Sequence, residues 1–299
     1  AATSADITGL AETVSGGTGT DVLALNGGGA FDLSSATLDS IELISGSASA
    51  DSITGTSAAD AINAGDGANL VSGAGGADNL IGGTGADTFA ATSADITGLA
   101  ETVSGGGGSD VLALNGGGAF DLSSATLDSI ELISGSASAD SITGTSAADT
   151  IAGGGGADVI NAGDGANLIS GGAGVDNLIG GTGADTFAAT SADITGLAET
   201  ISGGAGTDVL ALNGGGAFNL SSTTLDSIEL ISGSASADSI TGTSAADAIN
   251  AGDGANLVSG AGGADNLIGG TGADTFAATS ADITGLAETI SGGTGTDVL

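Results

Sequence analysis

The 299-residue sequence contains no Lys, Arg or His, and it also lacks Cys, Met, Pro, Trp and Tyr. Without Cys, no disulfide framework can hold the fold together. Without Lys and Arg, the chain has none of the side chains through which proteins bind nucleic acids or anionic membranes, so we exclude nucleic acid as a partner. No apolar run approaches the roughly 18 residues needed to span a bilayer, and we expect no membrane insertion.

The same absences argue against catalysis. Only carboxylates and hydroxyls remain as acids, bases or nucleophiles. Paired carboxylates can hydrolyse glycosides, but the Trp and Tyr side chains that stack against sugars are missing. A nearly identical repeat also offers no unique cleft. We therefore predict that the chain is not an enzyme.

Acidic residues dominate the charge. The sequence has 29 Asp and 7 Glu, and its net charge of −36 has no internal counter-charge. Acidic composition with few aromatic residues is often typical of disorder. Here 40% of the residues are apolar and recur at fixed spacing, which indicates a folded chain. The partners that suit this composition are cations.

Internal repeats organise the chain. The motif AATSADITGLAET begins at Ala1, Ala90, Ala188 and Ala277, with Val or Ile following it. We predict four copies within one continuous solenoid, at residues 1–89, 90–187, 188–276 and, truncated, 277–299. The second copy is longer by nine residues, inserted near Ala152–Ile160. Nine residues are therefore the structural unit.

The two halves of the nine-residue unit explain why the unit repeats. Ser134–Phe187 consists of six such units without a gap, and shorter arrays occupy Ser45–Phe89 and Ser232–Phe276. Each unit has a Gly-rich half, suited to turns with positive φ, and an Asp-x-apolar half, suited to a short strand with the apolar side chain inside. One unit cannot bury its apolar side chain alone, so units must stack.

Two units make one coil of about 18 residues, with parallel strands on two faces. The predicted fold is therefore all-β: a parallel β-solenoid forming a rod, with a core of Ile, Leu and Val and with the Phe residues packed inside. The inserted nonapeptide is half a coil, so it should move the third copy to the opposite sheet. Finding Ile53, Ile142 and Ile240 all on one sheet would contradict this coil.

The first part of each copy, such as Ala1–Ile44, is less regular. Its alternating apolar residues favour continued strands and turns. A short helix within Asp6–Thr13, with Asp6 as its N-cap, is the alternative.

Stacking brings the turn carboxylates close together. Two carboxylates roughly 5 Å apart repel by about 3 kcal/mol at an effective dielectric constant near 20. A divalent cation between successive turns makes the interaction between them attractive. Ca²⁺ suits this place because it accepts six to eight oxygen ligands in flexible geometry. Carboxylate and carbonyl oxygens, without imidazole or thiolate, favour calcium over zinc, copper or iron. A solvated carboxylate or an Asx turn is the alternative for each turn Asp.

The turn motif G-G-x-G-x-D is intact at nine places: Gly16–Asp21, Gly82–Asp87, Gly105–Asp110, Gly153–Asp158, Gly171–Asp176, Gly180–Asp185, Gly203–Asp208, Gly269–Asp274 and Gly292–Asp297. Gly73–Asp78 and Gly260–Asp265 carry Ala at the second place, and Asn63–Asn69 and its equivalents move a carboxylate to Asp66, Asp164 and Asp253. The predicted ligands are Asp21, Asp66, Asp78, Asp87, Asp110, Asp158, Asp164, Asp176, Asp185, Asp208, Asp253, Asp265, Asp274 and Asp297, with Gly153, Gly171 and Gly180.

Other turns depart from the motif. SGSASAD and TGTSAAD lack the second and fourth Gly, so Asp51, Asp60, Asp140, Asp149, Asp238 and Asp247 are expected to bind calcium weakly or not at all. The four turns from Gly153 to Asp185 include none of these, and calcium should bind there most tightly. Glu12, Glu42 and their equivalents are expected to be solvated surface charges.

The nonapeptide resembles the calcium-binding repeat of RTX (hemolysin-type) proteins, G-G-x-G-x-D-x-U-x with U a large apolar residue. The resemblance implies a right-handed parallel β-roll with Ca²⁺ bound in turns between adjacent coils. It also implies export by type I secretion in an unfolded state and folding in millimolar external calcium, hence an extracellular, secreted or cell-surface bacterial protein. The segments between arrays look similar to linking segments of very large bacterial adhesins and surface-layer proteins.

The function predicted from the sequence is that of an extracellular, calcium-stabilised structural repeat protein: a filament, a surface-layer element or an adhesin stalk. Its expected partners are calcium ions and copies of itself joined end to end. Two alternatives are a module that binds a surface such as ice or polysaccharide, and a passive RTX segment of a larger toxin or enzyme.

Overall fold

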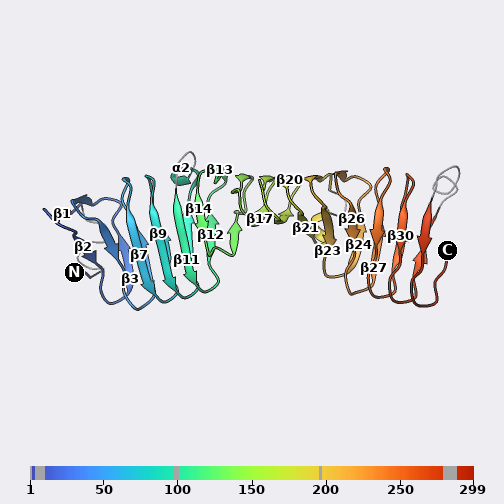
Figure 1. Ribbon diagram of the computed structural model, residues 1–299, viewed down its shortest axis with the longest axis horizontal. Helices are drawn as coiled ribbons and strands as arrows, with labels where there is room; N and C mark the ends of the chain where they lie inside the picture. The colour runs from blue at the N-terminus through green and yellow to red at the C-terminus, as the bar shows by residue number, and fades with distance from the viewer. Residues whose placement is uncertain (1, 4–10, 97–100, 195–196, 279–287) are drawn as a thin grey trace. The chain divides into compact units, whose positions relative to one another are not determined.

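The computed structural model describes residues 2–3, 11–96, 101–194, 197–278 and 288–299. The chain forms two compact units, Ala1–Thr145 and Ser146–Leu299, and the boundary between them falls inside the second repeat copy. Within each unit, short strands of successive coils lie side by side (Figure 1). Among the described residues, the paired strands run parallel. No helix in this part of the chain is long and apolar enough to span a membrane.

In the first unit, strands alternate between two main sheets. One has the order β3-β6-β8-β10-β12-β15 and the other β14-β11-β9-β7-β5-β2; β13 pairs with β16 and β1 with β4. The strands are β1 (Thr13–Ser15), β2 (Val22–Ala24), β3 (Gly29–Asp32), β4 (Thr37–Asp39), β5 (Leu43–Ser45), β6 (Asp51–Thr54), β7 (Ala61–Asp66), β8 (Leu70–Ser72), β9 (Asn79–Thr84), β10 (Thr88–Ala91), β11 (Thr102–Gly107), β12 (Val111–Leu114), β13 (Gly118–Asp121), β14 (Thr126–Asp128), β15 (Leu132–Ser134) and β16 (Asp140–Thr143).

The second unit has the same construction. Its sheets have the orders β17-β19-β21-β23-β26-β28-β30-β32, β18-β20-β22-β25 and β24-β27-β29-β31. The strands are β17 (Thr150–Gly155), β18 (Val159–Asn161), β19 (Leu168–Ala173), β20 (Asn177–Thr182), β21 (Thr186–Ala189), β22 (Thr200–Ala205), β23 (Val209–Leu212), β24 (Gly216–Asn219), β25 (Thr224–Asp226), β26 (Leu230–Ser232), β27 (Asp238–Thr241), β28 (Ala248–Asn250), β29 (Leu257–Ser259), β30 (Asn266–Ile268), β31 (Thr275–Phe276) and β32 (Thr289–Ser291).

The register of the arrays gives the length of a coil. Ile53 pairs with Val71, and Ile62 pairs with Leu80 in the other main sheet. Each pair is separated by two nonapeptides, because the intervening unit crosses to the opposite sheet. The predicted parallel β-solenoid with about 18 residues per coil is therefore confirmed.

Equivalent residues of the first two copies lie in different sheets. In the first unit, Ile53 lies in β6 and its equivalent Ile142 lies in β16, which belongs to a different sheet. The arrangement that would have contradicted a coil of two units is absent from these strands.

The inserted nonapeptide shifts the chain by half a coil, as predicted. Ile44 and Ile133 are equivalent residues with no inserted nonapeptide between them. They lie in different sheets of the first unit. In the second unit, the insertion separates the equivalent residues Ile151 and Ile249, and both lie in the same sheet.

The core consists of rows of apolar side chains inside each stack, one row along each main sheet. Phe89 is 1% exposed and stands in register between Val71 and Leu112. The Phe residues are therefore layers within the stack, which confirms their predicted core role. Burying one such side chain contributes about 1.5–3 kcal/mol.

Among the described residues, two single-turn helices interrupt the strands: α2 (Ser93–Ile96) and α3 (Ser191–Ile194). The favoured strand–turn interpretation is wrong for these copies. Asp95, the equivalent of Asp6, is not the N-cap but the third helical residue, and its Oδ2 accepts hydrogen bonds from Thr92 N and Oγ1 at 2.7 and 2.8 Å. Asp6 itself lies outside the described residues.

Candidate metal sites in the turns

The turn carboxylates form a ladder along the edge of each stack. Asp stands two residues before the inward apolar residue, so alternation points both side chains inward. The backbone N–H of one turn residue then donates to the carboxylate one coil on: Asn69 N to Asp87 Oδ1 at 2.8 Å, and Asp87 N to Asp110 Oδ1 at 2.7 Å. The same ladder joins Asn167, Asp185 and Asp208 in the second unit. We call this arrangement the carboxylate ladder.

In six of the intact G-G-x-G-x-D turns, the second carboxylate oxygen has no hydrogen-bond partner. Asp87 and Asp110 are fully buried, and the Oδ2 atom of each lacks any hydrogen bond. Burial raises the pKa of Asp87, the hydrogen bond from Asn69 N opposes this, and the charge of Asp110 raises it further. The same unpartnered Oδ2 occurs at Asp21, Asp185, Asp208 and Asp274.

A carbonyl oxygen borders the same space as this free oxygen. A methyl group placed on Gly82 would meet both Asp87 Oδ2 and the Gly105 carbonyl oxygen of the next coil, the latter at 2.7 Å. Two acceptors face each other here, and the chain has no cationic side chain to place between them. Such a pair is unfavourable when buried unless a cation lies between the oxygens. The residues therefore fit a hard cation such as Ca²⁺.

The turns that begin at Gly153 and Gly180 repeat this arrangement. A methyl group on either would meet the turn's own Asp Oδ2 and the carbonyl of Gly171 or Gly203, at 2.6 and 2.7 Å. At Gly171 the three nearest atoms all belong to Asp176, because the next coil carries helix α3 instead of a Gly-rich turn.

Sequence reasoning missed one source of carbonyl oxygens. A methyl group on Gly105 would meet Asp110 Oδ2 and the carbonyl of Ser129, a residue with φ of 53°. Ser40 and Ser227 hold the same left-handed conformation beside Gly16 and Gly203. A positive φ is costly for a non-Gly residue. No motif in the sequence predicts this conformation at the three Ser residues.

The Ser- and Thr-containing turns satisfy their carboxylates locally. Asp60 Oδ2 accepts hydrogen bonds from Thr56 N at 2.6 Å and Thr56 Oγ1 at 3.0 Å. Ser47 N donates in the same way to Asp51 Oδ2, and Ser234 N to Asp238 Oδ2. These donors stand four residues before the Asp, so the bonds are not Asx turns, in which the donor lies two residues after it. They occupy the oxygen that faces a carbonyl in the intact turns. Asp51 and Asp238 each keep a buried Oδ1 without a partner.

Three predicted ligands lie away from the ladder. Asp66, Asp164 and Asp253 are exposed on the outer surface. Asp66 Oδ1 accepts the Thr84 hydroxyl at 2.6 Å, and Asp164 does the same for Thr182. Because these carboxylates are solvated and hydrogen-bonded to a neighbouring strand, we leave them out of the site proposed below.

The expectation that every Glu is a solvated surface charge is wrong for Glu101 and Glu199, which are 5% and 4% exposed. Asp78 N donates to Glu101 Oε2 at 2.9 Å, and Asp176 N donates to Glu199 Oε2 at 2.6 Å. The signal was present in the sequence, because Glu101-Thr102-Val103 keeps the acid-x-apolar phase of the Asp turns. Glu12 and Glu42 are exposed, as expected.

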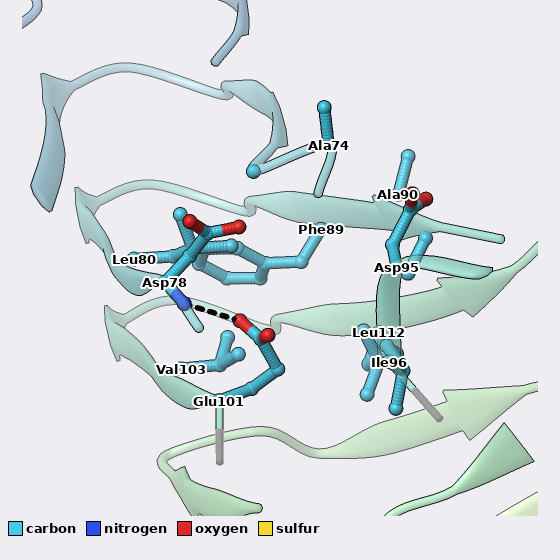
Figure 2. Close-up of a pocket in the computed structure, with 12 residues that line it drawn as sticks. Ala74, Asp78, Leu80, Phe89, Ala90, Asp95, Ile96, Glu101, Val103 and Leu112 are labelled. Atoms are coloured by element: carbon cyan, nitrogen blue, oxygen red, sulfur yellow. Dashed lines mark hydrogen bonds between the residues drawn. The ribbon is translucent and has the colours of Figure 1, made fainter. Parts of the chain in front are cut away.

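Figure 2 shows Glu101 reaching toward Asp78. Both residues line a cavity of about 20 Å³. Glu101 Oε1 has no hydrogen-bond partner. Burial raises its pKa to about 7; the hydrogen bond from Asp78 N opposes this, and the charges of Asp78 and Asp95 add to it. A matching cavity in the second unit contains Asp176, Asp193 and Glu199.

Within the described ranges, no group of three or more acidic side chains lies close enough to hold a metal ion. A cation in these turns would therefore depend on backbone carbonyls together with one or two carboxylates. Such mixed oxygen ligands are typical of Ca²⁺ rather than of transition metals.

Comparison with known proteins agrees with this chemistry. The family model described as "RTX calcium-binding nonapeptide repeat (4 copies)" matches residues 38–71, 54–89, 128–160, 153–187, 195–216, 224–258 and 241–276, which together cover well over half of the chain. A search of curated proteins finds no match. The chain therefore belongs to the family of RTX calcium-binding nonapeptide repeat proteins.

Proposed function

We propose that this chain is a structural repeat segment whose coils are held together by calcium, and that it works outside the bacterial cell as part of a filament, a surface layer or an adhesin stalk. One observation carries the proposal: buried carboxylate oxygens face carbonyl oxygens in a chain with no cationic side chain. The family supports the extracellular location, because its members are typically secreted bacterial proteins.

The proposed calcium ligands are the free Oδ2 atoms of the intact turns and the carbonyl oxygens that border the same space. The carboxylates are those of Asp21, Asp87, Asp110, Asp185, Asp208 and Asp274. Each cation would neutralise part of a ladder that otherwise stacks like charges, and binding to the folded state alone makes folding depend on calcium.

Calcium titration of the chelator-treated chain tests this proposal, with circular dichroism as the readout. We expect β-structure to form as calcium is added, and magnesium to be a poor substitute because it gives up its water ligands reluctantly. Asp110→Ala should raise the calcium concentration needed for folding, whereas Asp66→Ala, which removes an exposed carboxylate, should leave it unchanged. Full β-structure in excess chelator would contradict the calcium requirement.

The alternative of a surface-binding module receives less support. Neighbouring outward positions on one sheet are Ser52, Leu70 and Thr88, a mixture of hydroxyl and aliphatic side chains. A flat binding face for ice or polysaccharide is better made by one repeated side chain. Electron microscopy of the native assembly would separate filament, layer and isolated chain.

A further inference from the structure

One turn in each full copy carries Asn where the ladder otherwise has Asp. These Asn turns are Asn63–Asn69, Asn161–Asn167 and Asn250–Asn256. The ladder residues Asn69, Asn167 and Asn256 are 3%, 2% and 2% exposed, so they are buried like Asp87, Asp185 and Asp274 of the intact turns. Each stands in the ladder directly before an intact turn.

Hydrogen bonds fix the orientation of each amide. Asp51 N donates to Asn69 Oδ1 at 2.9 Å. A backbone N–H can only donate, so the amide oxygen must face it and the amide nitrogen must point the other way. Asn69 Nδ2 accordingly donates to the carbonyl oxygens of Gly67 at 3.1 Å and Gly82 at 3.4 Å.

The two other Asn turns make the same contacts. Asn167 Nδ2 donates to Gly180 O at 3.4 Å, and Asn256 Nδ2 donates to Gly269 O at 3.3 Å. Each acceptor is the first Gly of the next intact turn in the ladder. The equivalent carbonyl one coil further on, that of Gly105, borders the free Oδ2 of Asp87.

We propose that Asn69, Asn167 and Asn256 take the place of a bound cation, so that each full copy contains one coil contact that needs no calcium. In an intact turn, a carboxylate oxygen and a carbonyl oxygen face the same space and require a positive charge between them. In an Asn turn, the NH₂ group supplies the positive side of that interaction from within the chain. This inference rests on the calcium sites of the proposed function.

The charge distribution of the Asn turns agrees with this role. Their only acidic side chain, Asp66 in the first copy, lies outside and is paired with Thr84. No negative charge therefore enters the ladder at this position. The Asn161–Asn167 turn is one of the four turns expected to bind calcium most tightly, and by this inference it binds no calcium in the ladder.

Counting bound calcium ions tests the inference. The ions bound per full chain are measured by calorimetric titration for the unmodified chain, for Asn69→Asp, and for Asn79→Asp as a control that adds the same charge on an exposed strand position. We expect Asn69→Asp to bind one more ion and to need more calcium to fold, and Asn79→Asp to match the unmodified chain. An unchanged count for a folded Asn69→Asp would overturn the inference.

The reverse substitution keeps the test decisive if Asn69→Asp does not fold. Asp87→Asn should bind one ion fewer and fold at a lower calcium concentration than Asp87→Ala, because the new amide can donate to the Gly105 carbonyl. Equal calcium requirements for Asp87→Asn and Asp87→Ala would overturn the inference. The proposed function is judged separately, since it fails if the unmodified chain binds no calcium or forms its full β-structure in excess chelator.

Discussion

Two kinds of coil occur in each compact unit. In the array coils, partners lie two nonapeptides apart and Gly-rich turns face each other. In the junction coils, helix α2 or α3 replaces a Gly-rich turn, and the paired residues Leu80 and Val103 are five residues further apart in sequence than an array pair. The longer Glu101 side chain maintains the contact that Asp makes elsewhere.

The two kinds of coil differ in what their carboxylates require. In an array coil, Asp158 Oδ2 and the Gly171 carbonyl oxygen border the same space, an arrangement that suits a cation. In a junction coil, Glu101 and Asp78 border a small, largely apolar cavity, and burial raises their pKa values to about 7 and about 6. The stability of the array coils is therefore expected to depend on calcium, and the stability of the junction coils on pH.

The largest expected effect comes from filling the space between oxygens in an array coil. Gly153→Ala places a methyl group against Asp158 Oδ2 and the Gly171 carbonyl, and should lower the free energy of unfolding by about 2–4 kcal/mol. Gly107→Ala is the control, because nothing lies within 4 Å of its new methyl group. Denaturant unfolding in saturating calcium measures both, and equal stability of the two variants would contradict the proposed geometry.

A smaller effect should appear on changing pH in saturating calcium. The pKa of Glu101 rises from its ordinary 4.5 to about 7 on folding. Between these values the folded chain binds more protons than the unfolded chain, so the free energy of unfolding should fall as pH rises from about 4.5 to about 7.

Removing the junction carboxylates isolates their part of this dependence. Glu101→Gln with Glu199→Gln should flatten the pH dependence and raise Tm at pH 8 by about 2–4 °C. Glu131→Gln, at an exposed ladder position, should change neither. An unchanged pH profile in the double variant would assign the dependence to other carboxylates.

The smallest effect concerns the turn next to the junction. Ala74 has φ of 63°, where its array counterpart Gly83 has φ of 110°. Ala74→Gly should raise the free energy of unfolding by about 0.5–1 kcal/mol, because Gly adopts a left-handed backbone without the Cβ clash. Ala77→Gly, in the same turn without a positive φ, should lower it by a similar amount. Thermal unfolding of both variants checks the opposite signs.

The regular part of the fold could be predicted from the sequence because its cause is local. Asp87 and Phe89 are two residues apart, so strand alternation alone turns both inward. Stacking then brings each turn beside the next, and two nonapeptides per coil follow from the nine-residue spacing. The inserted nonapeptide shifts the chain by half a coil for the same reason.

The remaining features depend on contacts that spacing does not encode. Burial of Glu101 follows from the docking of helix α2, although its phase with Val103 was visible in the sequence. Asp66 faces solvent because its strand continues past the inward position. The left-handed conformation of Ser129 is imposed by the loop around it. No change in composition marks the boundary between the two compact units.

Alternation of the copies between sheets has a consequence for recognition at the surface. Ile44 and Ile133 are equivalent residues on different sheets of the first unit, so the side chains beside them face different sides. A partner that follows one face therefore meets a given pattern once in every two copies. Adding one nonapeptide changes this spacing, as Ile151 and Ile249 illustrate in the second unit. A nine-residue duplication can thus change which side chains are exposed on each sheet, while the core keeps the same kind of apolar contacts.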